Sequence, residues 1–165
     1  MRTVRDMAKN DEIWTPPEAV LPLIKYLPGK IEDEAFYFGR QRIYWEMCPG
    51  SGQLVDILSD EGLQVVTAIN WNSLEKEPMA WDVIVTNPPW SQKHLFLERC
   101  MGLEKPFALL LPVRTLGVRR CQVLLYDIDV LFLARRVDFT GGGAPYEACA
   151  WFTRGLLPDR MVFEG

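Results

Sequence analysis

The sequence predicts an α/β fold, a single domain over residues 1–165 built on an open, mostly parallel sheet. Two observations support this prediction. Apolar runs such as 82–86 and 107–112 have the composition of buried strands, and helical patterns separate them. The run 43–47 passes through the glycine turn 50–52 directly into an amphipathic segment, and this strand–turn–helix unit is typical of parallel sheets.

Composition favours a globular protein without a metal site or a membrane span. Hydrophobic residues make up 48% of the chain, and no run is long enough to cross a bilayer. The four cysteines are widely spaced and the single histidine is His94, so no zinc site of ordinary spacing is expected. The first residues do not fit a signal peptide. We therefore expect reduced thiols and a cytoplasmic protein.

The N-terminal third carries one helix signal. We expect residues 1–10 to form a mobile arm. Thr15 then stands as a predicted N-cap, with Pro16 at the first helical position and Glu18 three residues after the cap. Apolar residues continue at helical spacing as far as Leu27. Residues 30–42 receive no assignment.

The remaining elements follow in alternation. After the strand 43–47 we expect a helix over 53–61 and strands over 63–69 and 82–86. Ser91 is a predicted cap for a helix over 92–101. The strand 107–112, a helix over 119–126, and the strands 129–134 and 148–153 complete the fold. The glycines 141–143 indicate a mobile loop, and residues 154–165 indicate a short tail.

The segment Asn87-Pro88-Pro89-Trp90 ends the strand 82–86 and suits a planar nitrogenous substrate. The Asn87 side-chain oxygen and the Pro88 carbonyl can both accept hydrogen bonds from one exocyclic amino group, and Trp90 offers a face for a ring to stack on. In open α/β sheets, ligands bind beyond the carboxyl ends of the strands. The alternative is a proline turn that ends a strand, with Trp90 in the core.

These motifs resemble the S-adenosylmethionine-dependent amino-group methyltransferases. Glu46 and the turn 48–52 are similar to their first motif, and Asn87-Pro88-Pro89-Trp90 is similar to their fourth. The order of the motifs matches N6-adenine DNA methyltransferases, notably compact phage and prophage members. The resemblance implies a Rossmann-like class I sheet with an antiparallel last strand. Only 12 residues, 70–81, separate the strand 63–69 from the strand 82–86. This is too few for a further helix and strand, so one edge βα unit of that sheet should be missing.

The resemblance also implies roles for individual residues. Catalysis falls to Asn87, Pro88, Pro89 and Trp90, with Phe139 beside the flipped base. Binding of S-adenosylmethionine falls to the N-terminal, first-motif and second-strand residues and to the motif asparagine: Thr15, Glu46, Cys48, Pro49, Gly50, Gly52, Asn70, Trp71, Asn72 and Asn87. Amides at Asn70 and Asn72 stand where the family has acids.

Charge bears on how a nucleic acid would be bound. The formal net charge is −4, which counts against tight, unaided DNA binding. Arg114, Arg119 and Arg120 nevertheless cluster in one stretch and form a candidate phosphate track. The chain leaves no room for a separate recognition domain, so specificity should be weak, built from loops, or supplied by an accessory protein or a homodimer.

Three other functions fit the same residues less fully. An RNA or protein-glutamine methyltransferase uses a similar Asn-Pro-Pro-aromatic motif. A methyltransferase-like module that binds a partner without catalysis would fit the amides at Asn70 and Asn72. A nicotinamide oxidoreductase is disfavoured, because Val55 stands where the third glycine of the dinucleotide motif would be.

Overall fold

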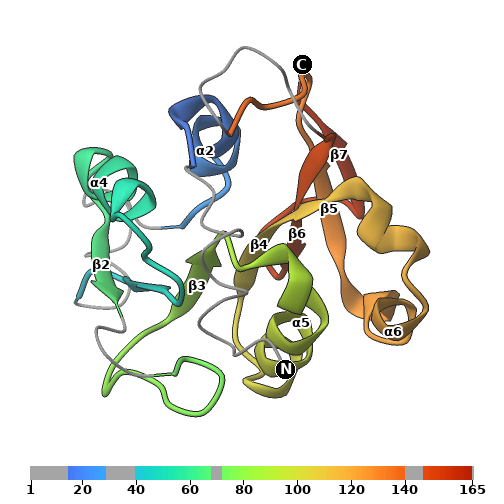
Figure 1. Cartoon of the computed structure of the whole chain (residues 1–165). Helices are drawn as coiled ribbons and strands as arrows, with labels where there is room; N and C mark the ends of the chain where they lie inside the picture. The colour runs from blue at the N-terminus through green and yellow to red at the C-terminus, as the bar shows by residue number, and fades with distance from the viewer. Residues whose placement is uncertain (1–14, 29–39, 68–71, 140–146, 165) are drawn as a thin grey trace.

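The computed structural model describes residues 15–28, 40–67, 72–139 and 147–164. Within them, seven strands form one sheet in the order β2-β1-β3-β4-β6-β5-β7 (Figure 1). The strands are β1 (Ile43–Glu46), β2 (Gln64–Thr67), β3 (Val83–Thr86), β4 (Phe107–Pro112), β5 (Asp129–Phe132), β6 (Cys149–Arg154) and β7 (Met161–Phe163). The predicted α/β fold is confirmed.

Helices cover the sheet in two groups. The longer ones are α2 (Pro17–Ile24), α4 (Gln53–Asp60) and α5 (Lys93–Gly102), and α6 (Arg119–Gln122) is a single turn. Short 3₁₀ segments are η1 (Trp90–Gln92), η2 (Val113–Gly117) and η3 (Leu125–Asp127). In Figure 1, α2 and α4 lie above the sheet, and α5 and α6 lie below it. None of the helices in the described ranges is long and apolar enough to span a bilayer.

Strand directions decide where a site can form. β1 runs parallel to β2 and β3, and β3 runs parallel to β4. β6 is antiparallel to both of its neighbours, β4 and β5, as predicted for the last long strand. The carboxyl ends of β1, β3, β4 and β5 therefore meet at one edge of the sheet. β2 is the outermost strand on its side, in agreement with the predicted loss of an edge unit.

The segment 154–165 differs from the predicted short tail, because it contains β7. This strand pairs in parallel with β5. The rings of Phe132 and Phe163 stack with centroids 4.9 Å apart, and the amide of Ala134 donates to Glu164 Oε2 over 2.9 Å. Three residues are too few to show a strand period in the sequence, so only the pairing with β5 reveals the element.

Three helix predictions also need correction. Pro16, not Thr15, is the N-cap of α2, and no side chain caps this helix. The helix predicted over 119–126 is only α6, followed by η3. The predicted cap at Ser91 is wrong as well, since α5 begins after Gln92 without a side-chain cap. The predicted arm, residues 1–10, lies outside the described residues.

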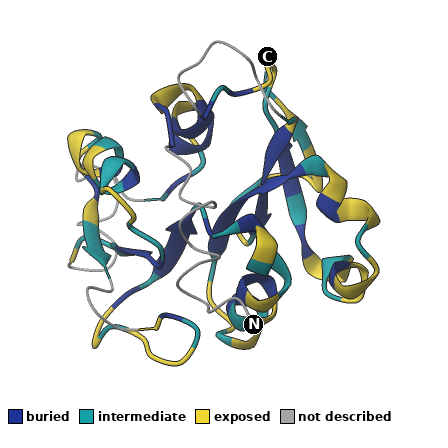
Figure 2. Ribbon diagram, viewed as in Figure 1, coloured by how far each residue is buried: buried dark blue, intermediate teal, exposed yellow. Residues whose placement is uncertain are grey.

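The core follows the centre of the sheet. β3 and β4 are buried along their whole length, as Figure 2 shows for the middle strands. The indole of Trp151 in β6 donates to the carbonyl of Ala19 over 2.6 Å and so fixes α2 against the sheet. This contact holds the start of α2 close to the carboxyl edge.

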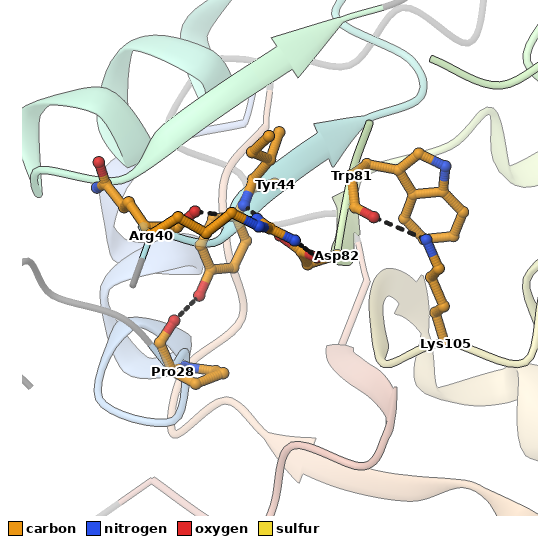
Figure 3. A network of polar contacts seen from close by, with 8 residues as sticks. Pro28, Arg40, Tyr44, Trp81, Asp82 and Lys105 are labelled. Carbon is orange, nitrogen blue, oxygen red and sulfur yellow. Dashed lines mark hydrogen bonds and ion pairs between the residues drawn. The ribbon is translucent and has the colours of Figure 1, made fainter. Parts of the chain in front are cut away.

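A polar network closes the opposite, amino edge of the sheet (Figure 3). Arg40 donates to both Asp82 oxygens over 2.6 and 2.7 Å, and the Ile43 amide donates to Asp82 Oδ2 over 2.9 Å. The Arg40 hydrogen bond lowers the pKa of Asp82 to about 2. Lys105 donates to the Trp81 carbonyl over 2.7 Å. These contacts connect the segments at the starts of β1, β3 and β4. The polar groups at the amino edge therefore stabilise the fold.

Candidate nucleotide and methyl-donor site

The Asn-Pro-Pro-Trp turn lies at the carboxyl end of β3. Asn87 follows directly on Thr86, and its amide contacts two side chains: Nδ2 donates to Thr15 Oγ1 over 2.9 Å, and Oδ1 accepts from Trp90 Nε1 over 3.2 Å. Pro88 and Pro89 lie between them and fix the backbone of the turn. The structure thus brings three predicted site residues together: Asn87, Thr15, which lies 72 positions before it in the sequence, and Trp90, which lies 3 positions after it.

Trp90 and Phe139 contact each other. Their ring centroids are 5.4 Å apart, the ring planes meet at 87°, and each residue is 5% exposed. The indole also donates to the Leu110 carbonyl over 3.2 Å. Trp90 thus contacts both Asn87 and Phe139, and the roles of the two rings in base binding stay predictions. No ring face is open between them, so a stacked base would require Phe139 to move aside.

Glu46 is a buried carboxyl at the end of β1. Oε1 accepts from the Cys48 amide over 2.7 Å and from the Thr86 hydroxyl. Oε2 is buried without a hydrogen-bond partner in the described structure. Burial raises the pKa of Glu46 to about 8, although the bonds from Thr86 and Cys48 act in the opposite direction. An unsatisfied buried oxygen is costly, so this atom is suited to meet a ligand hydroxyl group, which can accept from the protonated carboxyl or donate to the carboxylate.

We expect stability to decrease as pH rises, because of Glu46. Its pKa is about 8 in the folded protein against 4.5 for a solvated group, so the folded state binds more protons between these values. Stability from this group is complete below about pH 4.5 and lost by about pH 8. The melting temperature of Glu46→Gln minus that of wild type should therefore increase from pH 5 to pH 9, as measured by scanning fluorimetry. A Glu104→Gln control, which alters an exposed carboxylate, should show no such pH-dependent gain.

The glycine turn after β1 is open to added side-chain atoms at Gly52. Gly50 and Gly52 have φ of +49° and +91°, and the Gly52 amide donates to the Pro49 carbonyl over 2.7 Å. A Cβ placed on Gly52 would meet no atom within 4 Å. The turn leads into α4, so backbone N–H groups gather there. Burial raises the pKa of the Cys48 thiol well above its ordinary value, which keeps it protonated.

The second-strand candidates are placed less completely. Asn70 and Trp71 lie outside the described residues. Asn72 is exposed, and its side chain caps a local turn: Oδ1 accepts from the Leu74 amide over 3.1 Å, and Nδ2 donates to Glu75 over 2.9 Å. The roles of these three residues in cofactor binding stay predictions.

The three candidate arginines divide into two settings. Arg114 forms an ion pair with Glu147 over 3.1 Å. Arg119 and Arg120, at the start of α6, line a groove of about 660 Å³ between α5 and α6, together with His94, Glu98, Val123 and Leu124. Both helices begin after strands that end at the carboxyl edge. The predicted glycine loop 141–143 lies outside the described residues.

Comparison with known proteins defines the fold. No protein-family profile and no curated protein matches the sequence. Among solved structures, PH1948 from Pyrococcus horikoshii, a candidate RNA methyltransferase, is 12% identical with a TM-score of 0.55, covering 86% of this chain and 84% of its own. The chain has the methyltransferase fold.

Two further solved structures of this fold are similar to the chain. The 23S rRNA methyltransferase ErmE is 13% identical with a TM-score of 0.55, covering 89% of this chain and 72% of its own. A dimethyladenosine transferase from Plasmodium falciparum is 12% identical with a TM-score of 0.51, covering 86% and 62%. In this fold, the turn after β1 and the turn after β3 lie at the same edge of the sheet.

Sequence reasoning missed two members of this site, Thr86 and Leu110, and one contact of a predicted member, Thr15. Thr86 donates to Glu46, the Leu110 carbonyl accepts from Trp90, and Thr15 accepts from Asn87. Thr86 could have been found as the one polar residue that ends an otherwise apolar strand. The other two contacts join distant segments, and nothing in the local sequence indicates them.

Proposed function

We propose that this protein transfers a methyl group from S-adenosylmethionine to the N6 amino group of adenine in DNA. The observation that carries the proposal is the position of Asn87 at the carboxyl end of β3, one residue after the Thr86 that bonds to Glu46. Asn87, which can accept a hydrogen bond from a substrate amino group, thereby lies at the same edge of the sheet as the glycine turn. The resemblance of both motifs to adenine methyltransferases supports the proposal.

The residues of the first motif fit the cofactor. Glu46 Oε2 is buried and unpartnered, Gly52 leaves open space, and the turn presents backbone amides beside the start of α4. A ligand that carries hydroxyl groups would satisfy that oxygen. Asn72 is taken up by its own turn, so the proposed site depends chiefly on the β1 side.

The proposed mechanism is direct displacement. When bound, S-adenosylmethionine supplies an electrophilic methyl group on its sulfonium. The Asn87 oxygen and the Pro88 carbonyl accept hydrogen bonds from the substrate amine and so hold its nitrogen lone pair toward the methyl donor. Positive charge develops on that nitrogen as it bonds to the methyl carbon, and the two oxygens stabilise this charge. The electron pair of the broken carbon–sulfur bond stays on the sulfur of the leaving thioether, and the methylated nitrogen releases one proton to solvent. The chain needs no covalent nucleophile for this step.

Base binding requires a rearrangement of the aromatic pair. Trp90 and Phe139 contact each other at 5.4 Å, which closes the space between them. We infer that the flipped adenine displaces the Phe139 ring and lies between Phe139 and Trp90. Phe139 lies outside the regular strands and helices, whereas the Trp90 indole is fixed by its hydrogen bond to the Leu110 carbonyl in β4. The movement therefore falls to Phe139.

The groove between α5 and α6 is the proposed path for the nucleic-acid backbone. Arg119→Glu combined with Arg120→Glu should weaken DNA binding at least about tenfold and reduce its salt dependence, because two phosphate contacts are lost. Fluorescence anisotropy with a labelled oligonucleotide at several salt concentrations would measure both effects. Lys76→Glu plus Lys25→Glu, which makes the same change of charge at exposed sites elsewhere, is the control. Equal weakening by the control would exclude the groove as the path.

RNA is the second candidate acceptor, because the similar structures named above include proteins described as acting on RNA. Transfer of a labelled methyl group to single- and double-stranded DNA, to RNA and to a glutamine-containing protein would separate the candidates. Methylated N6-adenine in DNA, identified by mass spectrometry after digestion, is the expected product. Label in RNA alone would replace DNA by RNA. Cofactor binding without label in any acceptor would favour the non-catalytic binding module.

A further inference from the structure

The geometry points to Trp90 and Thr15 as positioning residues that fix which way round the Asn87 amide is held. The indole N–H of Trp90 donates to Asn87 Oδ1 over 3.2 Å, and Asn87 Nδ2 donates to Thr15 Oγ1 over 2.9 Å. We call these three side chains the amide clamp. The inference rests on the proposed function, because it concerns how Asn87 meets a substrate amine.

The indole decides the orientation. An indole N–H can only donate, whereas the two ends of an amide differ only in whether they accept or donate. The Asn87 atom that faces Trp90 must therefore be the oxygen, since the amide NH₂ group would set one donor against another. The hydroxyl of Thr15 can donate or accept, so it adapts to the NH₂ group and does not select the orientation by itself.

Trp90 itself is held firmly enough to serve as a reference. Its N–H also donates to the Leu110 carbonyl over 3.2 Å, so one proton is shared between β4 and Asn87. Leu110 lies inside a six-residue strand that is buried along its whole length. The amide clamp thus transmits the position of a rigid strand to Asn87.

A fixed orientation matters for the proposed reaction. A carbonyl oxygen has two lone pairs, so Asn87 Oδ1 can accept from Trp90 and still accept from a substrate N–H. In the reversed amide, an NH₂ group would face the substrate amine and repel it. A proline turn followed by any aromatic residue would offer a ring for stacking, but only an indole supplies this N–H toward Asn87. Trp90 therefore has a role separate from base stacking.

The direct test uses the ¹⁵N-labelled protein without cofactor or nucleic acid. The side-chain NH₂ signals of Asn87 are identified by their loss in Asn87→Asp, and their exchange with water is measured by NMR. Trp90→Phe keeps a ring and removes the N–H, so exchange should accelerate about two- to tenfold, the range for one lost neutral hydrogen bond. Trp45→Phe is the matched control, because the buried Trp45 indole N–H has no hydrogen-bond partner in the described structure.

A second pair of variants covers the case in which Trp90→Phe fails to fold. Thr15→Ser keeps the hydroxyl that accepts from Asn87, and Thr15→Val removes it with little change of shape. Thr15→Val should accelerate Asn87 exchange and lower kcat about two- to tenfold while KM for DNA is unchanged, and Thr15→Ser should restore both values. A role confined to folding would not give this split between kcat and KM.

The outcomes separate the clamp from the proposed function. Faster Asn87 exchange in Trp90→Phe and Thr15→Val, but not in Trp45→Phe or Thr15→Ser, supports the amide clamp even if wild type methylates nothing. Unchanged exchange in both Thr15→Val and a folded Trp90→Phe would overturn the clamp even if wild type methylates DNA. Failure of wild-type methylation alone would overturn only the proposed function.

Discussion

Asn87→Ala is expected to lower methyl transfer to adenine by on the order of 10²–10³-fold, the typical loss on removing one group that stabilises transition-state charge. The Asn87 oxygen is one of two acceptors proposed to orient the substrate amine, and the Pro88 carbonyl alone cannot fix its direction. The loss should appear in kcat measured at saturating cofactor and nucleic acid. Retention of more than about a tenth of the wild-type rate would contradict the assignment.

The control must separate chemistry from folding. Asn87 bonds to Thr15, so its removal also affects the contact between the β3 turn and the segment before α2. Gln64→Ala removes an amide of the same type from an exposed position on β2 and should keep the wild-type rate. Both variants should keep the circular-dichroism spectrum and the melting temperature of wild type to within a few degrees. A large loss of melting temperature in Asn87→Ala alone would indicate a folding defect.

The long elements could be predicted from the sequence because each carries its own signal. β3 and β4 are continuous apolar runs, and the strand 107–112 matches β4 at both ends. The turn after β1 has residues at positive φ, and the glycines at these positions in the sequence predict such a turn. The sequence predicts that a parallel sheet binds its ligand beyond the carboxyl ends of the strands, and Glu46 and Asn87 lie at the carboxyl ends of β1 and β3.

The unpredicted features depend on contacts between distant segments. β7 exists only through its pairing with β5, and α6 is shorter than its pattern indicated. Thr15 has the sequence signature of an N-cap, yet its hydroxyl bonds to a side chain 72 residues away. A hydroxyl can form only a few hydrogen bonds, so a residue suited to capping a helix can bond to a distant side chain in place of the backbone amides of that helix.

Cofactor binding is the step on which the proposed function depends most, and Gly50→Asp is expected to abolish it. Titration calorimetry of wild type with S-adenosylmethionine and with S-adenosylhomocysteine should give micromolar binding. Gly50 has a φ of +49°, where an aspartate is strained, so the control must carry a comparable strain. The added carboxylate would fill the turn after β1 and place a second acidic group where the ligand is proposed to bind.

Gly62→Asp is the matched control for this experiment. Gly62 also has a positive φ, +81°, and a Cβ there would meet no atom within 4 Å, but it follows α4 at the end away from the glycine turn. It therefore adds the same charge and at least as much strain, and binding should persist. If wild type binds neither compound at millimolar concentration, the buried Glu46 oxygen must be completed by a partner or nucleic acid, or the fold lacks the chemistry. Repeating the titration with DNA present identifies a site that nucleic acid completes, because the cofactor would then bind.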